Sequence, residues 1–139
     1  MKKVLFLCAG NSCRSQIAEA IVNARLGETW QAFSAGIKPA GYVHPKAISV
    51  LSEIGIHYSG TSKRVDEFQD VDFDLVITVC DSAAEECPIW IGKGKRIHHS
   101  FPDPALTDNL DDFRTVRDDI EKVMFVLLTT SKENNDSIF

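Results

Sequence analysis

The chain has 139 residues, of which 44% are hydrophobic and 25% are charged, and its formal net charge is -5 at pH 7. This length and composition are typical of one globular domain with a single hydrophobic core. The acidic excess and the lack of a basic block argue against nucleic acid or an anionic membrane as a partner. We expect a single domain over residues 1–130 and a flexible polar tail over residues 131–139.

The amino-terminal apolar run is much shorter than a signal peptide or a membrane span requires. Without a secretory signal, the 4 cysteines are expected to be reduced thiols in the cytoplasm. Cysteine in this chain is therefore expected to serve chemistry more than covalent cross-linking.

Apolar runs of strand length alternate with segments of helical periodicity along the chain. The expected elements, in chain order, are a strand over residues 4–8, a helix capped by Ser12 and ended by a left-handed Gly27, a strand over residues 30–35, a helix from Pro45 to Gly55, a helical turn over residues 62–68, a strand over residues 73–80, a helical turn or two over residues 81–88, a strand over residues 96–101 and a helix capped by Asn109. This alternation predicts an α/β fold, in which a four-stranded parallel sheet carries helices on both faces.

In open parallel sheets, ligands bind beyond the carboxyl ends of the strands. Cys8, Cys80 and the segment Pro102-Asp103-Pro104 each follow an expected strand. We therefore expect them to lie along one edge of the sheet.

The segment Cys8-Ala9-Gly10-Asn11-Ser12-Cys13-Arg14-Ser15 leads from the first expected strand into the first expected helix. Backbone N–H groups converge at such a helix start, where they bind anions and favour the ionised form of a thiol. The segment lacks the Gly-Lys-Ser/Thr ending of a Walker-type phosphate loop, and its defining group is a thiol. We therefore predict that the whole segment binds a tetrahedral oxyanion.

The residue types of this segment suggest separate roles. Cys8 would attack the central atom of the oxyanion, while Arg14 would bind two of its oxygens. Ser15 can donate to the thiolate, and Asn11 can adopt a left-handed conformation, although ordinary capping and turn formation explain both residues equally well. Cys13 is expected to pack beneath the loop without a chemical role.

Asp103 lies between two prolines, which stiffen its backbone. Held over an anion site, its carboxyl group would be the general acid for a leaving oxygen. The alternative is a solvated turn aspartate. The upstream cysteine loop favours the acid.

Cys80 and Cys87 allow three interpretations. A zinc site would need two close-spaced ligand pairs, and the only partners, His98 and His99, would point to opposite faces of a strand. Both cysteines could instead be structural. In the third interpretation, one thiol attacks a Cys8 adduct, expels the reduced product and leaves a disulfide that the other thiol takes over. Such a relay needs an oxyanion that accepts two electrons, as arsenate does and phosphate does not.

These residues resemble a known family, the low-molecular-weight protein tyrosine phosphatases, and within it the thioredoxin-coupled arsenate reductases. The likeness runs from Met1 to about Leu128 and is carried by the loop Cys8–Ser15 with Gln16 and Glu19, by Ser34-Ala35-Gly36, by Cys80 and Cys87, and by Asp103-Pro104. The resemblance implies a four-stranded parallel sheet and a relay from Cys8 to Cys80 to Cys87. It also implies thioredoxin as the electron donor, with NADPH and thioredoxin reductase behind it, and no bound cofactor.

Two positions depart from the family pattern. Tyrosine phosphatases of this fold place a tyrosine after the Asp-Pro pair, where this chain has Ala105. Some reductases of the family bind a monovalent cation at positions that match Asn11, Glu19, Ser34 and Thr61, near an acidic residue that is Lys63 here. The Lys63 ammonium would replace the ion, so we expect no obligatory metal.

Three functions follow as hypotheses. The first is an enzyme that reduces arsenate to arsenite with Cys8, Arg14, Asp103, Cys80 and Cys87. The second is a phosphatase on phosphotyrosine or small phosphomonoesters, which needs only Cys8, Arg14 and Asp103. The third is an oxyanion sensor that binds without turnover.

Overall fold

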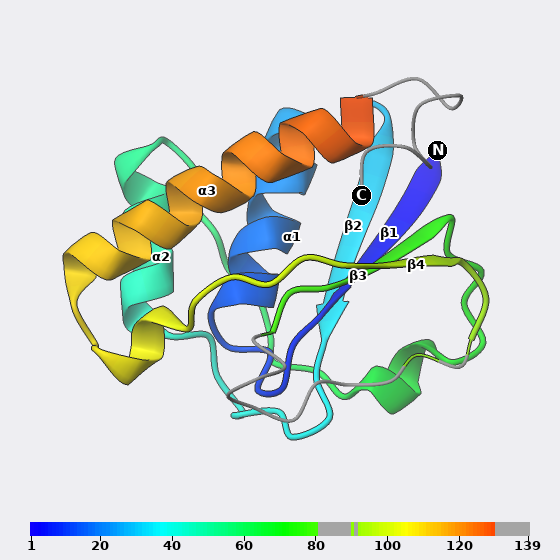
Figure 1. The fold of residues 1–139 in the computed structure, drawn as a ribbon, viewed down its shortest axis with the longest axis horizontal. Helices are drawn as coiled ribbons and strands as arrows, with labels where there is room; N and C mark the ends of the chain where they lie inside the picture. The colour runs from blue at the N-terminus through cyan, green and yellow to red at the C-terminus, as the bar shows by residue number, and fades with distance from the viewer. Residues whose placement is uncertain (81–89, 91, 130–139) are drawn as a thin grey trace.

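The computed structural model describes residues 1–80, 90 and 92–129 (Figure 1). Its centre is a four-stranded sheet with the order β2-β1-β3-β4, in which all neighbouring strands run parallel. The strands are β1 (Lys2–Leu7), β2 (Trp30–Ala35), β3 (Leu75–Thr78) and β4 (Lys95–His98). The predicted four-stranded parallel sheet is confirmed.

The two faces of the sheet are covered differently. The helices α1 (Arg14–Arg25), α2 (Pro45–Glu53) and α3 (Leu110–Thr129) pack in one core cluster with side chains of β1 and β3, and α3 runs across α1 and α2 (Figure 1). The opposite face of β1 packs with the short 3-10 helix η1 (Val65–Phe68) and with Trp90. Because neighbouring residues of a strand point to opposite faces, Phe6 belongs to the first cluster and Leu5 to the second.

Side chains cap the starts of α2 and α3, and the second of these caps agrees with the sequence-based expectation. His44 caps α2, because its Nδ1 accepts a hydrogen bond from the Lys46 amide at 3.1 Å. Asn109 precedes α3, and its Oδ1 accepts from the Asp111 amide at 2.8 Å. Along the part of the chain that the structure describes, no helix is long and apolar enough to cross a bilayer.

The expected ends of α1 were wrong. The residue before the helix is Cys13 rather than Ser12, and no side chain caps it. At the other end the helix stops at Arg25 with Leu26 as its cap, and Gly27 is absent from the left-handed glycines. Glycine is required at position 27 for a steric reason, because a Cβ there would lie 2.4 Å from the Asn23 carbonyl oxygen. The expected turns over residues 81–88 and the expected tail over residues 131–139 lie outside the described residues.

Glu53 joins the end of α2 to α3 through two arginines. Its Oε2 lies 2.7 Å from Nη2 of Arg114 and its Oε1 lies 2.9 Å from Nη1 of Arg117. The hydrogen bonds from Arg114 are the largest cause that lowers the pKa of Glu53. A carboxyl group whose pKa is lowered by folding stabilises the protein above its unfolded pKa and loses that contribution as the pH falls through the folded value.

We therefore expect Glu53→Gln to lower the melting temperature slightly at pH 7. The difference from wild type should persist through the neutral range and close as the pH falls below about 4, where carboxyl groups become protonated in both states. Melting curves recorded from pH 7 to pH 3 test this. Asp66→Asn, which removes an exposed ion pair with Arg64, is the control, and an equal effect of both substitutions would contradict a specific role of Glu53.

Candidate active site

A cavity of about 300 Å³ opens at the carboxyl end of the sheet. It is lined by Cys8, Ala9, Gly10, Ser12, Cys13, Arg14, Ala40, Tyr42, His44, Asp103 and Ala105. The fold therefore brings the Cys8 loop and Asp103 to one place. Asn11 and Ser15, which belong to the same loop, do not line the cavity and are fully buried.

The segment that follows β2 holds the backbone carbonyls of the loop Cys8–Ser15 away from the cavity. The Lys38 amide donates to the Ala9 carbonyl at 3.0 Å, the Ala40 amide to Gly10 at 2.9 Å and the His44 amide to Ser12 at 3.0 Å. Because the C=O and the following N–H of a trans peptide point in opposite directions, carbonyls held outward leave the next N–H groups directed inward. The N–H groups that follow these three carbonyls are thus available to an anion in the cavity.

Cys8 is 2% exposed, at the base of the cavity. Its Sγ lies 3.0 Å from Ser15 Oγ, which also accepts a hydrogen bond from Asn11 Nδ2 at 2.9 Å. The Ser15 hydroxyl therefore lies within hydrogen-bond distance of both the Cys8 sulfur and the Asn11 amide.

Asn11 has the left-handed conformation that its residue type allows, with φ at 47°. Its Oδ1 accepts from the Lys63 amide at 2.7 Å and from Gln16 Nε2 at 3.0 Å. The side chain therefore fixes the loop on two sides, so its role exceeds that of a simple turn residue.

Gln16 and Tyr58 support the loop, and the sequence analysis assigned no role to either of them. Gln16 is fully buried and also donates to the Thr61 carbonyl at 2.8 Å. The single hydroxyl hydrogen of Tyr58 is shared between Gln16 Oε1 and, at 2.8 Å, Glu19 Oε2. Burial, followed by the charge of Glu19, raises the pKa of Tyr58, which keeps the phenol protonated as a donor. The available signal was the spacing of Gln16 and Glu19, two polar residues one helical turn apart near the start of an expected helix.

Arg14 connects the loop to Asp103. It is 3% exposed, its Nη1 donates to the Phe101 carbonyl at 3.1 Å, and its Nη2 lies 3.7 Å from Asp103 Oδ2. The other carboxylate oxygen, Oδ1, accepts from the Ala105 amide at 3.0 Å, where Asp103 caps the 3-10 helix η2 (Pro104–Leu106). The carboxyl group is therefore oriented at the mouth of the cavity.

The remaining cysteines differ from Cys8. Burial is the largest cause that raises the pKa of Cys13 to about 12, so this residue is a neutral thiol at physiological pH. Cys80 follows β3, is fully buried and is disulfide-bonded, whereas Cys8 and Cys13 are free. Cys87 lies outside the described residues.

The positions that match the cation ligands of some reductases of the family place several oxygens around Lys63. Glu19 Oε1 accepts from Ser34 Oγ at 2.7 Å and lies 3.7 Å from Lys63 Nζ, which donates to the Thr61 carbonyl at 2.6 Å. The ammonium group already supplies a positive charge among these oxygens. An additional monovalent cation therefore fits this position poorly.

Exchanging sodium for potassium at constant ionic strength should leave the melting temperature of the wild-type protein unchanged. Lys63→Asp removes the ammonium and adds a carboxylate, so this variant should become more stable in potassium than in sodium. A potassium-dependent melting temperature of the wild-type protein would contradict the role of Lys63.

Two substitutions separate the conformation of Asn11 from its hydrogen bonds. Asn11→Gly and Asn11→Ala both lose the side-chain contacts and should bind phosphate more weakly in calorimetric titrations. Asn11→Ala should also be less stable than Asn11→Gly by about 1 kcal/mol, because only glycine avoids the steric penalty of the left-handed region. Equal stability of the two variants would show that the positive φ of this position is not retained.

Comparison with known proteins places this geometry in a family. Residues 3–137 match the family described as low molecular weight phosphotyrosine protein phosphatase. The chain is 42% identical over 137 residues to a protein from Halalkalibacterium halodurans named arsenate reductase, with 94% of this chain and 98% of that protein covered. It is 41% identical over 125 residues to the arsenate reductase of Bacillus subtilis, with 86% of this chain and 89% of that protein covered.

Solved structures with a similar fold come from the same kinds of protein. One described as an arsenate reductase in the phosphate binding state superposes with a TM-score of 0.81 at 34% identity, covering 92% of this chain and 97% of that chain. The low molecular weight protein tyrosine phosphatase from T. tengcongensis has a TM-score of 0.74 at 25% identity, covering 92% of this chain and 98% of its own. The chain therefore belongs to the low molecular weight phosphotyrosine protein phosphatase family.

Proposed function

We propose that this protein reduces arsenate to arsenite. The observation that carries the proposal is the cavity that holds Cys8, Arg14 and Asp103 together, with the buried, disulfide-bonded Cys80 following the neighbouring strand β3. Relatives that are 41% and 42% identical and are named arsenate reductase support it. A bound tetrahedral oxyanion would meet the loop amides and the Arg14 guanidinium on one side and the Cys8 sulfur on the other.

The first step forms a covalent adduct. The Cys8 thiolate attacks the arsenic atom, an S–As bond forms, and one As–O bond breaks. Asp103 donates a proton to the departing oxygen, which leaves as water. Arsenic remains in its +5 state, and the loop amides together with Arg14 stabilise the negative charge on the other oxygens.

The second step transfers two electrons. This step needs the reduced protein, in which a dithiol has first opened the disulfide at Cys80. The Cys80 thiolate then attacks the Cys8 sulfur, the S–As bond breaks, and its electron pair stays with arsenic, which leaves as arsenite. Cys87 then attacks the Cys80 sulfur and releases Cys8 as a thiolate. The resulting Cys80–Cys87 disulfide requires an external dithiol, for which we propose thioredoxin, supplied by thioredoxin reductase and NADPH. This chemistry suits the reducing cytoplasm.

Phosphatase activity is the second candidate, because Cys8, Arg14 and Asp103 suffice for it and the fold is shared with a tyrosine phosphatase. Phosphorus cannot accept electrons from thiols, so a phosphocysteine would be hydrolysed instead. Ala105 follows Asp103-Pro104 at the cavity and offers no aromatic ring to a phosphotyrosine. Catalytic efficiencies on arsenate and on phenyl phosphate decide between the two, and anion binding without turnover of either would indicate a sensor.

Substitution of each cysteine by serine tests the order of thiols. With arsenate and the thioredoxin system, Cys8→Ser should form no arsenite and Cys80→Ser should stop at the adduct. Cys87→Ser should complete about one turnover per molecule and then stop, because the Cys8–Cys80 disulfide is no longer resolved. Arsenite is quantified in quenched reactions, alongside NADPH oxidation.

Two results would contradict the relay. Steady-state reduction by Cys80→Ser would show that another thiol attacks the adduct. Loss of the first turnover in Cys87→Ser would show that Cys80 does not act first.

A further inference from the structure

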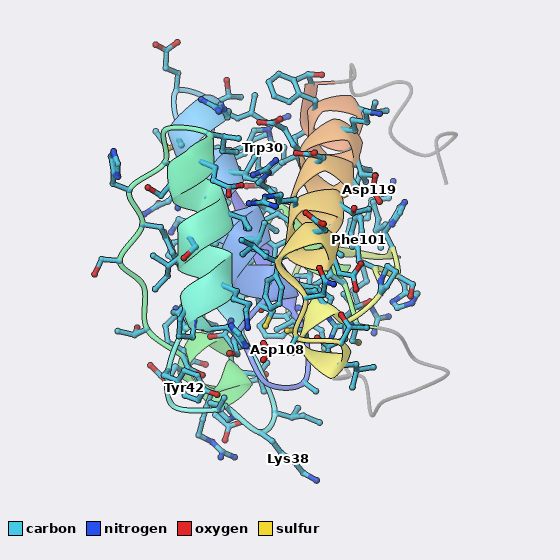
Figure 2. All side chains as sticks on the ribbon, turned by 90° about the vertical axis from the view of Figure 1, so that its left-hand side faces the viewer. Trp30, Lys38, Tyr42, Phe101, Asp108 and Asp119 are labelled. Carbon is cyan, nitrogen blue, oxygen red and sulfur yellow. The ribbon has the colours of Figure 1, made fainter. Side chains whose placement is uncertain are left out.

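Asp108 ties the segment that carries Asp103 to the start of α2. Asp108 Oδ1 accepts a hydrogen bond from Lys46 Nζ at 2.7 Å and lies 3.5 Å from His44 Nε2. Both partners belong to the start of α2, and His44 itself lines the cavity. Figure 2 shows Asp108 between α2 and α3.

His44 is held in one orientation. Its Nδ1 accepts from the Lys46 amide, so the ring hydrogen of the neutral imidazole is on Nε2, the nitrogen nearest Asp108. The ring also packs against Phe113, with a centroid distance of 4.8 Å. The His44 amide donates to the Ser12 carbonyl, so His44 connects Asp108 to the loop Cys8–Ser15.

Residues 103–108 are internally hydrogen-bonded. The Leu106 amide donates to the Asp103 carbonyl at 3.3 Å and the Asp108 amide donates to the Pro104 carbonyl at 3.1 Å. Asp108 has a φ of 54°, which turns the chain toward α3. A displacement of Asp108 is therefore transmitted to Asp103.

We propose that Asp108, held by Lys46 and His44, is a positioning residue for Asp103. This inference rests on the proposed function, in which Asp103 donates a proton to the leaving oxygen. Lys46, His44 and Asp108 form a clamp that links the acid segment to the same helix start that shapes the anion loop. The clamp sets the distance between the proton donor and an anion bound over Cys8.

A positioning role differs measurably from that of an ordinary surface ion pair. The Asp108 side chain is 60% exposed, so its ion pair contributes little to global stability. Misplacement of a general acid slows cleavage of esters with poor leaving groups and spares esters whose leaving group departs without a proton. The ratio of the two rates therefore reports the position of Asp103.

Asp108→Asn is the appropriate variant, because asparagine tolerates the left-handed conformation while the charge is removed. We expect kcat/KM for phenyl phosphate to fall roughly tenfold, and kcat/KM for 2,4-dinitrophenyl phosphate and the Kd of inorganic phosphate to change less than about twofold. Lys46→Met should act in the same direction. The matched control is Asp72→Asn, which breaks an exposed pair with Lys93 on another surface and should change none of these values.

Three other results for the rates and for phosphate binding would overturn the proposal. Equal losses on both esters, or weaker phosphate binding, would show that Asp108 acts on the cavity as a whole, and unchanged kinetics would show a plain surface pair. Amide hydrogen exchange over residues 103–109 is the second readout and should be faster in Asp108→Asn than in Asp72→Asn. Hydrogen exchange needs no turnover, so unaltered exchange in Asp108→Asn would contradict the clamp whether or not the protein is active. A wild-type protein that hydrolyses no ester and reduces no arsenate would refute the proposed function alone.

Discussion

The outward pairing of the loop carbonyls is the constraint on which the site depends. The amides of Lys38, Ala40 and His44 hold the carbonyls of the Cys8 loop away from the cavity. The loop can also approach the end of β2 closely, because a Cβ at Gly36 would lie 2.5 Å from the Ala9 carbonyl oxygen. As a result, amide donors converge where an anion would bind. A chain with a net charge of -5 can thus bind an oxyanion through a local arrangement of dipoles and one arginine, against its overall charge.

The parallel sheet supplies the other groups. Since the carboxyl ends of β1, β3 and β4 meet at one edge, Cys8, Cys80 and Asp103 are delivered to the same side of the molecule although they are far apart in sequence. Arg14 then joins the loop to the acid segment through the Phe101 carbonyl and the Asp103 carboxylate. The loop and the acid alone suit either a phosphatase or a reductase. The additional thiols of Cys80 and Cys87 are what favour reduction in our proposal.

Local patterns predicted β2 from Trp30 to Ala35, the cap of α3 and the left-handed Asn11, because apolar periodicity and residue-specific backbone preferences decide these features. The start of α1 was missed, since the carbonyl of Ser12 pairs with a distant amide and the helix begins later. Gln16, Tyr58 and Asp108 were missed for a related reason. Their partners lie on other elements, and no local pattern encodes such contacts.

The central claim is that electrons pass from Cys80 to Cys8-bound arsenic and that the oxidised pair is finally Cys80 and Cys87. The protein is first fully reduced and then freed of reductant. Disulfide mapping by mass spectrometry after a single arsenate turnover, with rapid alkylation of free thiols and a sample without arsenate as the control, then tests the claim most directly. We predict a Cys80–Cys87 disulfide together with alkylated Cys8 and Cys13. A disulfide between Cys8 and Cys13, or arsenite release with Cys80 and Cys87 both alkylated, would contradict the account.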